Sequence, residues 1–350
     1  MLSKLAKLLG AAVVSLAASG AALAQAVPTV KLWGASATVD AYHGFLFLGN
    51  PLGFYEKQGV KVEFGTAAGS AATLQLLASG QVDMGYIGMD VLILAKSRNP
   101  QLPVKAVFLQ DRGNIYEVVV PADSPVKSLA DLKGKNIGVA NLASGAIPNL
   151  KGMLTDAKIN PNDVNLIPVG NGAQAATALT TGRVQALSLF RAQHALIETL
   201  GVKFRYFTRE APSAVIAVNT NFLEKNREAV VRVLRGVALS STFAQRNPEA
   251  AVKEFWKIHG APKGLSEKEA LDRSAHVLTS TAKLWKDHKD TGTKWGDMND
   301  ATWNTMQQFL ISQQQLTAPV PVAELYTNAL TDAVNNINLQ PAIDAATSYK

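Results

Sequence analysis

The chain has 350 residues, of which 47% are hydrophobic and 17% charged, with no cysteine and a formal net charge of +7. This length and apolar content suit one large or two medium domains and exclude wholesale disorder. The lack of cysteine excludes a disulfide framework, a zinc–thiolate site, an iron–sulfur cluster, a cysteine nucleophile and a lipid-modified N-terminal cysteine.

The first 24 residues have the pattern of a secretory signal peptide. Lys4 and Lys7 precede a run rich in Ala, Leu and Val, which ends in Ala22-Leu23-Ala24. This pattern predicts cleavage after Ala24 and a periplasmic location. A membrane anchor is the alternative, but the run of about 17 residues is rich in small residues and has no stop-transfer flank.

The remaining positive charge is spread along the chain. Removal of residues 1–24 takes away Lys4 and Lys7 and lowers the formal charge from +7 to +5, and no run of four basic residues follows. Nucleic-acid binding usually needs a concentrated basic patch, so we expect no nucleic-acid partner. No later segment has the 18 or so uninterrupted apolar residues of a membrane-spanning helix.

Strand and helix signals alternate through the first two thirds of the chain. Helices are expected after Asp40, Ser70 and Asp90, where a side chain can cap each one. Strands that alternate with helices predict βαβ units and mostly parallel sheets. The predicted strands lie within 30–33, 60–64, 82–88, 103–110, 116–124, 128–141, 164–168, 184–190, 204–207 and 213–219.

Beyond residue 219 the pattern becomes mostly helical. Its hydrophobic spacing predicts a helical C-terminal extension that packs on the first α/β unit and offers no obvious binding loop. The predicted helices cover 228–246, 248–259, 267–284, 301–315 and 322–336.

Several segments together resemble a known family. In chain order they are "GFYEKQGVKVEF" (53–64), "LLASGQVDMGYIG" (76–88), "SLADLKGKNIGVAN" (128–141), "ALTTGRVQA" (178–186) and "NTNFLEKNREAVVRVLRG" (219–236). In this order the chain resembles the periplasmic substrate-binding proteins of ABC importers for nitrate, sulfonate, taurine and pyrimidine precursors.

The resemblance implies a type II periplasmic binding protein fold. Two α/β lobes, each a mostly parallel sheet flanked by helices, would be joined by two crossing strands, with the ligand in the cleft between them. Lobe 1 would comprise residues 25–112 plus 213–350, and lobe 2 residues 113–212. The implied partners are a small-molecule ligand and a membrane permease, and we expect a monomer without cofactor or metal.

The candidate site follows from the strand ends. Ligands of such folds sit beyond the carboxyl ends of parallel strands, where helix N-termini offer free N–H groups. Ser70 and Ser144 could equally act only as helix caps, and Asp90 is expected to cap its helix and not to contact an anion. The candidate ligand-binding residues are Ser36, Ala37, Thr38, Tyr42, His43, Gly69, Ser70, Ala71, Gly88, Met89, Gln110, Ser144, Gly145, Asn171 and Arg191.

Arg191 directly follows the strand "ALSLF" and could clamp a carboxylate or sulfonate. The alternative is a surface arginine at a helix start, where the helix dipole slightly disfavours it. Where the family often has Asp-Ala, this chain has Gln185-Ala186. This difference weakens the inference that the chain binds the same ligand as better-known members. Tyr42, Tyr86, Tyr116 and Phe190 could form a stacking wall, although each could also be core.

The sequence therefore predicts a periplasmic receptor that delivers a small organic anion, such as a sulfonate or carboxylate, to an ABC importer. A neutral aromatic heterocycle, such as a pyrimidine or thiamine precursor, is the alternative ligand. An enzyme resembling a pyrimidine synthase, with His43 in the cleft, is a further alternative. We expect no enzyme, because the five histidines are scattered and no P-loop, G-x-S-x-G or complete dinucleotide fingerprint occurs.

Overall fold

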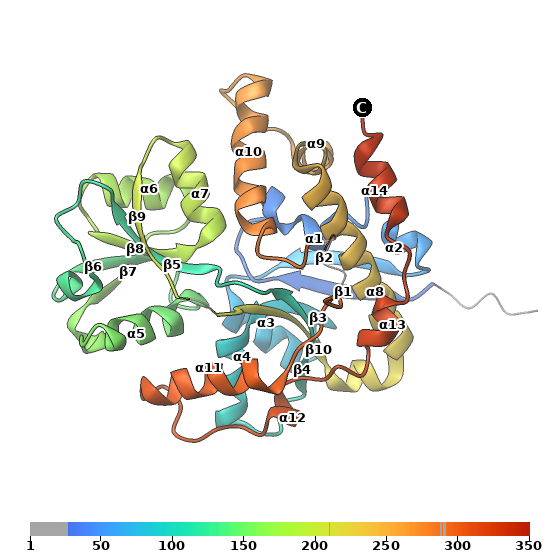
Figure 1. Cartoon of the computed structure of the whole chain (residues 1–350), viewed down its shortest axis with the longest axis horizontal. Helices are drawn as coiled ribbons and strands as arrows, with labels where there is room; N and C mark the ends of the chain where they lie inside the picture. The colour runs from blue at the N-terminus through green and yellow to red at the C-terminus, as the bar shows by residue number, and fades with distance from the viewer. Residues whose placement is uncertain (1–26, 210, 288, 290–291) are drawn as a thin grey trace, which may run out of the picture.

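The computed structural model describes residues 27–209, 211–287, 289 and 292–350, so the predicted signal peptide and its cleavage site lie outside the described residues. Two five-stranded mixed sheets lie side by side, each flanked by helices (Figure 1). This arrangement confirms the predicted two-lobe α/β architecture.

The first sheet has the strand order β2-β1-β3-β10-β4. Strand β10 runs antiparallel to both of its neighbours, while β1 is parallel to β2 and β3. We call this sheet and the helices packed on it lobe 1. Its strands are β1 (Thr29–Gly34), β2 (Lys61–Thr66), β3 (Met84–Gly88), β4 (Val104–Asp111) and β10 (Ala214–Asn219).

The second sheet has the order β7-β6-β8-β5-β9 and forms lobe 2. Here β5 is the reversed strand, antiparallel to β8 and β9, while β6 is parallel to β7 and β8. In each lobe the reversed strand is the one that enters from the other lobe. The strands are β5 (Tyr116–Pro121), β6 (Asn136–Val139), β7 (Asn165–Pro168), β8 (Ala186–Phe190) and β9 (Phe204–Phe207).

The helices of the α/β units mostly follow the strand ends. In lobe 1 they are η1 (Ala41–His43), α1 (Gly44–Phe47), α2 (Phe54–Lys57), α3 (Ser70–Ala78) and α4 (Met89–Arg98). In lobe 2 they are η2 (Leu129–Leu132), α5 (Ala146–Asp156), η3 (Pro161–Asp163), α6 (Gly172–Thr180) and α7 (Arg191–Thr199).

The C-terminal part is helical, as predicted, but it bridges the lobes instead of packing on lobe 1 alone. Helix α10 contacts α7 of lobe 2, and α11 contacts α5. Figure 1 shows α10 above the junction of the lobes and α11 below it. The helices are α8 (Thr220–Arg246), α9 (Pro248–His259), α10 (Glu267–Ala282), α11 (Asp300–Ser312), α12 (Val322–Leu325), α13 (Thr331–Asn335) and α14 (Gln340–Thr347).

The prediction of a single helix over residues 322–336 is wrong in one respect. The chain forms α12 and α13 with an extended break between them, because Tyr326 pairs with Ala106 at the edge of the first sheet. The Thr327 N–H donates to the Ala106 oxygen at 3.0 Å. A tertiary hydrogen bond has therefore replaced the local helical one.

Alternation of side chains along β10 explains why lobe 1 has helices on both faces. Ala214, Ile216 and Val218 point into the apolar cluster that includes α8, whereas Val215 and Ala217 point into the cluster that includes α3, α4 and α11. All five are fully buried. Because successive side chains of a strand point to opposite faces, such an all-apolar strand needs cover on both sides.

Two chain crossings between the lobes lie side by side. The first joins β4 to β5 and the second joins β9 to β10. The Ser213 hydroxyl accepts from the Ile115 N–H at 3.0 Å and donates to the Gly113 oxygen at 2.8 Å, and the Asn114 amide donates to the Arg209 oxygen at 3.1 Å. We propose that these crossings are the boundary between lobe 1 (25–112 plus 213–350) and lobe 2 (113–212).

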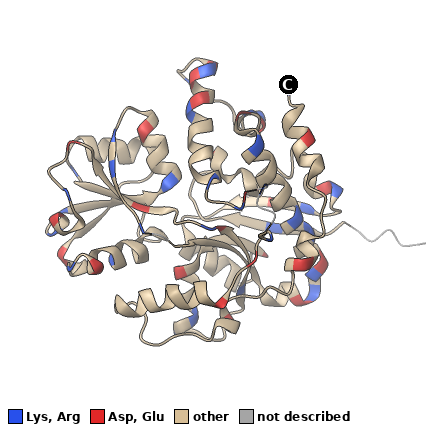
Figure 2. Cartoon of the chain, viewed as in Figure 1, with Lys and Arg blue, Asp and Glu red and all other residues tan. Residues whose placement is uncertain are grey.

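Charged residues are dispersed over both lobes (Figure 2). In the described part of the chain, no helix is both long enough and apolar enough to cross a membrane.

Candidate functional site

A small cavity lies between the two lobes, next to the crossings. Its volume is about 50 Å³, enough for a few water molecules, so the lobes are closed on each other. It is lined by Ala35, Ser36, Ala37, Tyr42, His43, Gly69, Ser70, Tyr86, Ile115, Tyr116, Ala140, Asn141, Ser144, Gly145, Asn171, Phe190, Ala192 and Thr281.

The short helix η1 presents Tyr42 and His43 to this cavity. Asp40 begins η1, and its backbone N–H donates to His43 Nδ1 at 3.2 Å, which fixes the imidazole. Burial lowers the pKa of His43 to about 3, so the ring is neutral at physiological pH. Because Nδ1 accepts a hydrogen bond, Nε2 carries the proton and is the donor available to a ligand.

Tyr86 lies in the middle of β3, and its hydroxyl is held by a residue behind the cavity wall. Its hydroxyl forms a short hydrogen bond to the Asp111 carboxyl, which is fully buried at the end of β4. Burial raises the pKa of Asp111 to about 7, and hydrogen bonding from Tyr86 and Trp285 offsets only part of that rise. Asp111 therefore positions Tyr86 without itself lining the cavity.

The lobes approach each other closely at two glycines. Gly69 has φ of 108° and faces the Ala143 oxygen of lobe 2, so a Cβ there would be strained and would clash. A Cβ on Gly145 would collide with the Tyr116 hydroxyl and would also lie 2.9 Å from Ser70 Oγ. These contacts close the cavity, and only glycine permits them at both positions.

Helices α3, α5 and α6 begin beside the cavity. Gly69 and Ser70, Ser144 and Gly145, and Asn171 are the lining residues at or next to their first turns. Free N–H groups at helix N-termini favour an acceptor or an anion. The Ser70 hydroxyl is already occupied in part, because it accepts from the Gly88 N–H at 3.1 Å.

Four buried side-chain oxygens of the cavity wall lack a hydrogen bond of standard geometry within the described residues. They are Ser36 Oγ, Tyr42 Oη, Asn171 Oδ1 and Thr281 Oγ1. A buried polar group without a partner costs free energy, so unpaired groups that converge on one cavity indicate a place for a polar ligand.

Aromatic rings form much of the remaining wall. The rings are Tyr42, His43, Tyr86, Tyr116 and Phe190. Tyr42 lies 4.0 Å from His43 and 5.4 Å from Phe190, measured between ring centroids. Among the described residues that line the cavity, none is Asp, Glu, Lys or Arg, and no cluster suited to a metal ion occurs in the described chain.

The structure brings most of the predicted site residues together. Those that line the cavity are Ser36, Ala37, Tyr42, His43, Gly69, Ser70, Ser144, Gly145 and Asn171. Their role in ligand binding is a prediction.

Five other predicted residues are directed elsewhere. Thr38 donates to Asp40 at 3.2 Å, and Ala71 lines a separate groove. Gly88 packs behind the wall, near Tyr116. Met89 is fully buried in the lobe 1 core, because its side chain faces inward where α4 begins. Gln110 lies 3.4 Å from the Ser241 hydroxyl, on the α8 side of the sheet.

Arg191 also lies outside the cavity wall. Its guanidinium is 2.6 Å from Glu117 Oε1, and the other Glu117 oxygen lies 3.2 Å from His194 Nδ1. Glu117 and His194 are almost fully buried. Burial lowers the pKa of His194, so the neutral ring donates to the carboxylate. The arginine is thus committed to an ion pair inside lobe 2.

Sequence reasoning missed Thr281 at the end of α10. This residue lies more than 60 residues beyond the last predicted strand, and its hydroxyl is buried and unpaired at the cavity. Only the packing of α10 across the lobe junction brings it there. Asn141 was also missed, although Ser144 and Gly145, three and four residues later, were predicted.

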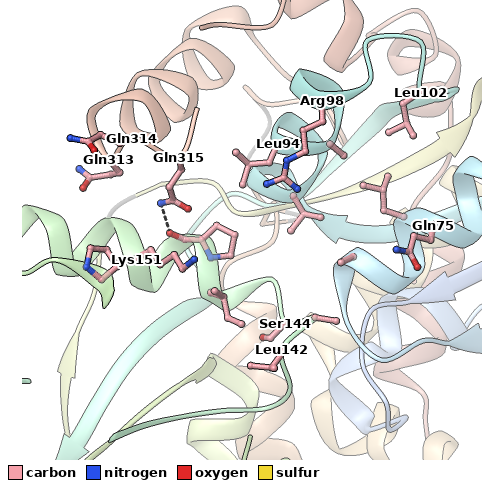
Figure 3. Close-up of a pocket in the computed structure, with 18 of the residues that line it drawn as sticks. Gln75, Leu94, Arg98, Leu102, Leu142, Ser144, Lys151, Gln313, Gln314 and Gln315 are labelled. Atoms are coloured by element: carbon pink, nitrogen blue, oxygen red, sulfur yellow. Dashed lines mark hydrogen bonds between the residues drawn. The ribbon is translucent and has the colours of Figure 1, made fainter. Parts of the chain in front are cut away.

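A wider groove of about 780 Å³ lies nearby and shares Ser144 with the cavity. Figure 3 shows it between α4, the loop that carries Leu142, and the end of α11, where Gln315 donates to the Pro148 oxygen at 2.9 Å. Arg98 and Lys151 line it. The cavity is the candidate site, because it lies between the lobes and its wall carries the buried oxygens without a hydrogen bond.

The sequence matches the family model described as NMT1/THI5 like over residues 40–251. The chain belongs to the NMT1/THI5-like family. The match includes every strand of both sheets except β1 and ends in α9, so it covers every cavity residue from Tyr42 to Ala192.

Two curated relatives of this NMT1/THI5-like protein are named as binding proteins. A Brucella abortus protein, described only as a binding protein, is 28% identical over 272 residues, which cover 74% of this chain and 79% of the relative. The formylaminopyrimidine-binding protein of Halalkalibacterium halodurans is 23% identical, with 84% of this chain and 88% of the relative covered.

Solved structures show the same fold. A protein from Bordetella bronchiseptica RB50 has a TM-score of 0.70 at 21% identity, covering 88% of this chain and 96% of that one. The periplasmic aliphatic sulphonate binding protein of Escherichia coli has a TM-score of 0.64 at 17% identity, covering 85% and 92%. An enzyme shares the fold as well, since the desulfurization enzyme DszB has a TM-score of 0.55 at 15% identity.

Proposed function

We propose that this NMT1/THI5-like protein is a periplasmic solute receptor of an ABC importer and that its solute is a small, neutral, flat heterocycle. The main support for this class of solute is the composition of the cavity wall, which has five aromatic rings and no charged side chain among its described residues. Aromatic faces stack on flat rings, and the neutral His43 and the unpaired oxygens supply directed hydrogen bonds.

The mechanism we propose is closure of the lobes on the solute. Lobe 1 contributes Tyr42, His43 and Ser36, and lobe 2 contributes Asn171 and Phe190. A solute that contacts both lobes favours the closed state, because only that state offers both sets of contacts. The closed monomer would then pass the solute to a membrane permease, with no cofactor.

A small organic anion is the second candidate. The N-termini of α3, α5 and α6 beside the cavity favour it. Two observations argue against an anion: His43 is neutral, and an ion pair holds Arg191 away from the cavity. The sulphonate-binding relative in Escherichia coli makes this candidate worth testing directly.

We propose a binding role in preference to catalysis. The cavity wall lacks a carboxylate or amine that could act as general base among its described residues, and His43 is a poor base at neutral pH because burial lowers its pKa to about 3. The named relatives in Brucella and Halalkalibacterium are binding proteins.

The deciding experiment is calorimetric titration of the purified chain with two groups of solutes. The first group holds formylaminopyrimidine and other neutral pyrimidines, and the second holds taurine and short alkanesulfonates. We expect saturable binding only in the first group, weakened by Tyr42→Phe. Binding confined to the sulfonates would establish the anion candidate instead, and conversion of a pyrimidine, detected by mass spectrometry, would establish an enzyme.

A further inference from the structure

Helix α11 is anchored on lobe 1 by its apolar side chains. Trp303, Met306 and Leu310 belong to the same buried cluster as side chains of α3, α4 and β10. The Trp303 ring also stacks on Tyr326, whose backbone pairs with β4 at the edge of the first sheet. We therefore expect α11 to move with lobe 1 as one body.

The end of α11 reaches α5 of lobe 2 through two hydrogen bonds. Gln313, which directly follows α11, donates from Nε2 to Asp156 Oδ1 at 2.7 Å. Gln315 donates from Nε2 to the Pro148 oxygen at 2.9 Å, as Figure 3 shows. The partners are 157 and 167 residues apart in the chain, so local structure does not require either bond.

A glycine in the middle of α5 lets the two helices approach closely. A Cβ on Gly152 would lie 2.0 Å from Cζ at the tip of the Phe309 ring of α11. The ring has little freedom to withdraw, because the Arg209 guanidinium carbon lies 3.5 Å from its centroid. Glycine weakens a helix relative to alanine, and the φ of Gly152 is not positive. The contact with Phe309 is therefore the structural reason for a glycine here.

The three contacts follow one stripe along α5. Pro148, Gly152 and Asp156 are spaced four residues apart, and residues at that spacing lie on the same face of a helix. Phe309 and Gln313 have the same spacing at the end of α11. Figure 1 shows this contact below the junction of the lobes, whereas α10 and α7 meet above it.

We propose that Phe309, Gln313 and Gln315 form a strap that holds α5 and stabilises the closed state without touching the solute. The described residues that line the cavity include none of the three. A rotation that moves lobe 2 away from lobe 1 separates α5 from the strap, so the contacts add free energy to the closed state alone. The strap rests on the proposed closure of the lobes but not on the class of solute.

The strap has a direct consequence for the protein without solute. Because its contacts lie entirely within the protein, a detectable fraction of the solute-free protein is closed. The solute then selects a state that already exists, and its apparent affinity includes the contribution of the strap. The three strap residues are accordingly positioning residues for affinity.

The lack of cysteine makes the test specific. Lys57→Cys in lobe 1 and Arg183→Cys in lobe 2 are exposed positions for one spin label each. Pulsed electron-spin distances between the labels report the closed and open populations. They are measured without solute in the labelled parent and in variants of both sides of the contact.

Gly152→Ala is the sharpest variant. Alanine is the better helix former, so α5 itself should lose nothing, and circular dichroism should show an unchanged helix content. Its methyl group meets the Phe309 ring, so the closed-to-open ratio should fall by about tenfold. Addition of Phe309→Leu, which removes the tip of the ring, should restore part of the closed population. A glycine with only a local role in α5 would show no such rescue.

Gln313→Ala tests the strap by a second route. It removes the hydrogen bond to Asp156 and should lower the closed-to-open ratio by about fivefold. Gln308→Ala, at an exposed position of the same helix, is the matched control and should leave the distances unchanged.

Two results would overturn the strap. One is a parent that shows only the open distance, and the other is a set of distances in Gly152→Ala and Gln313→Ala equal to those of the parent. No arm contains a solute, so a wrong solute class does not affect the result. Conversely, unchanged distances would leave the solute titration, and with it the proposed receptor, untouched.

Discussion

Asp111 shows how a single residue can support the cavity at a cost to stability. Its carboxyl is fully buried, it binds the Tyr86 hydroxyl, and burial raises its pKa from 3.8 to about 7. Between these two pH values the folded protein holds a proton that the unfolded chain has released. The free energy of unfolding therefore falls as the pH rises through this window.

Asp111→Asn should remove this pH dependence. The amide imitates the protonated carboxyl and can still accept from Tyr86, so the variant should be more stable than the parent by about 4 kcal/mol near pH 8 and about equal to it near pH 4. Urea unfolding at both pH values measures this. An exposed control, Asp123→Asn, should change neither value. An equal difference at both pH values would contradict the assignment.

Arg191 leads to a different expectation now that its partner is known. Arg191→Ala removes a cation from the buried Glu117, which keeps only His194 close by. We expect a loss of about 2 kcal/mol in the free energy of unfolding, because a buried charge loses part of its compensation. Solute affinity should stay within about twofold of the parent by calorimetry. A selective loss of affinity at unchanged stability would return Arg191 to the binding site.

At the scale of elements, the C-terminal extension completes the site. Helix α10 packs on α7 of lobe 2 and brings Thr281 to the cavity, while α11 reaches α5 on the other side. Gln313 donates to Asp156 of α5 at 2.7 Å, and the Arg209 guanidinium lies 3.5 Å above the Phe309 ring. The extension thus contacts both lobes.

Thr281→Val tests the part of α10 in binding. The exchange keeps the shape and removes only the unpaired hydroxyl, so stability should be unchanged or higher by about 1 kcal/mol. If the hydroxyl binds the solute, its loss should weaken affinity by about tenfold in calorimetric titration. Thr279→Val, at an exposed position of the same helix, is the control and should have no effect. Unchanged affinity in Thr281→Val would remove Thr281 from the site.

At the scale of the whole molecule, the paired crossings would act as the hinge of the closure that we propose. Ser213 and Asn114 tie the two crossing segments together by hydrogen bonds, so a rotation of the lobes about them would leave each sheet intact. In the structure the lobes are closed on a cavity of about 50 Å³. In the mechanism that we propose, the lobes separate to admit the solute and close on it again.

Small-angle X-ray scattering should detect this motion. Without solute we expect a larger radius of gyration than that calculated for the closed structure, since open molecules contribute to the average. A saturating solute from the titration panel should reduce it to the closed value. A solute that binds but leaves the radius unchanged would contradict closure.

The sequence by itself determined the elements and their order. The alternation of apolar strands with capped helices predicted both sheets, and the glycine-containing loops after the strands predicted where Gly69, Ser70, Ser144 and Gly145 would meet. These inferences succeed because they depend on local periodicity and on the rule that the carboxyl ends of parallel strands share one edge of a sheet.

Only the tertiary structure decided which side chains face the cavity and what charge they present. Met89 and Arg191 follow strand ends as the true lining residues do, yet one packs into the core and the other pairs with Glu117. Thr281 arrives from a distant helix. Side-chain direction and ion pairing depend on neighbours that are far apart in the chain. For this reason the expected anion-binding arginine lies outside the cavity, and the cavity wall is aromatic and uncharged.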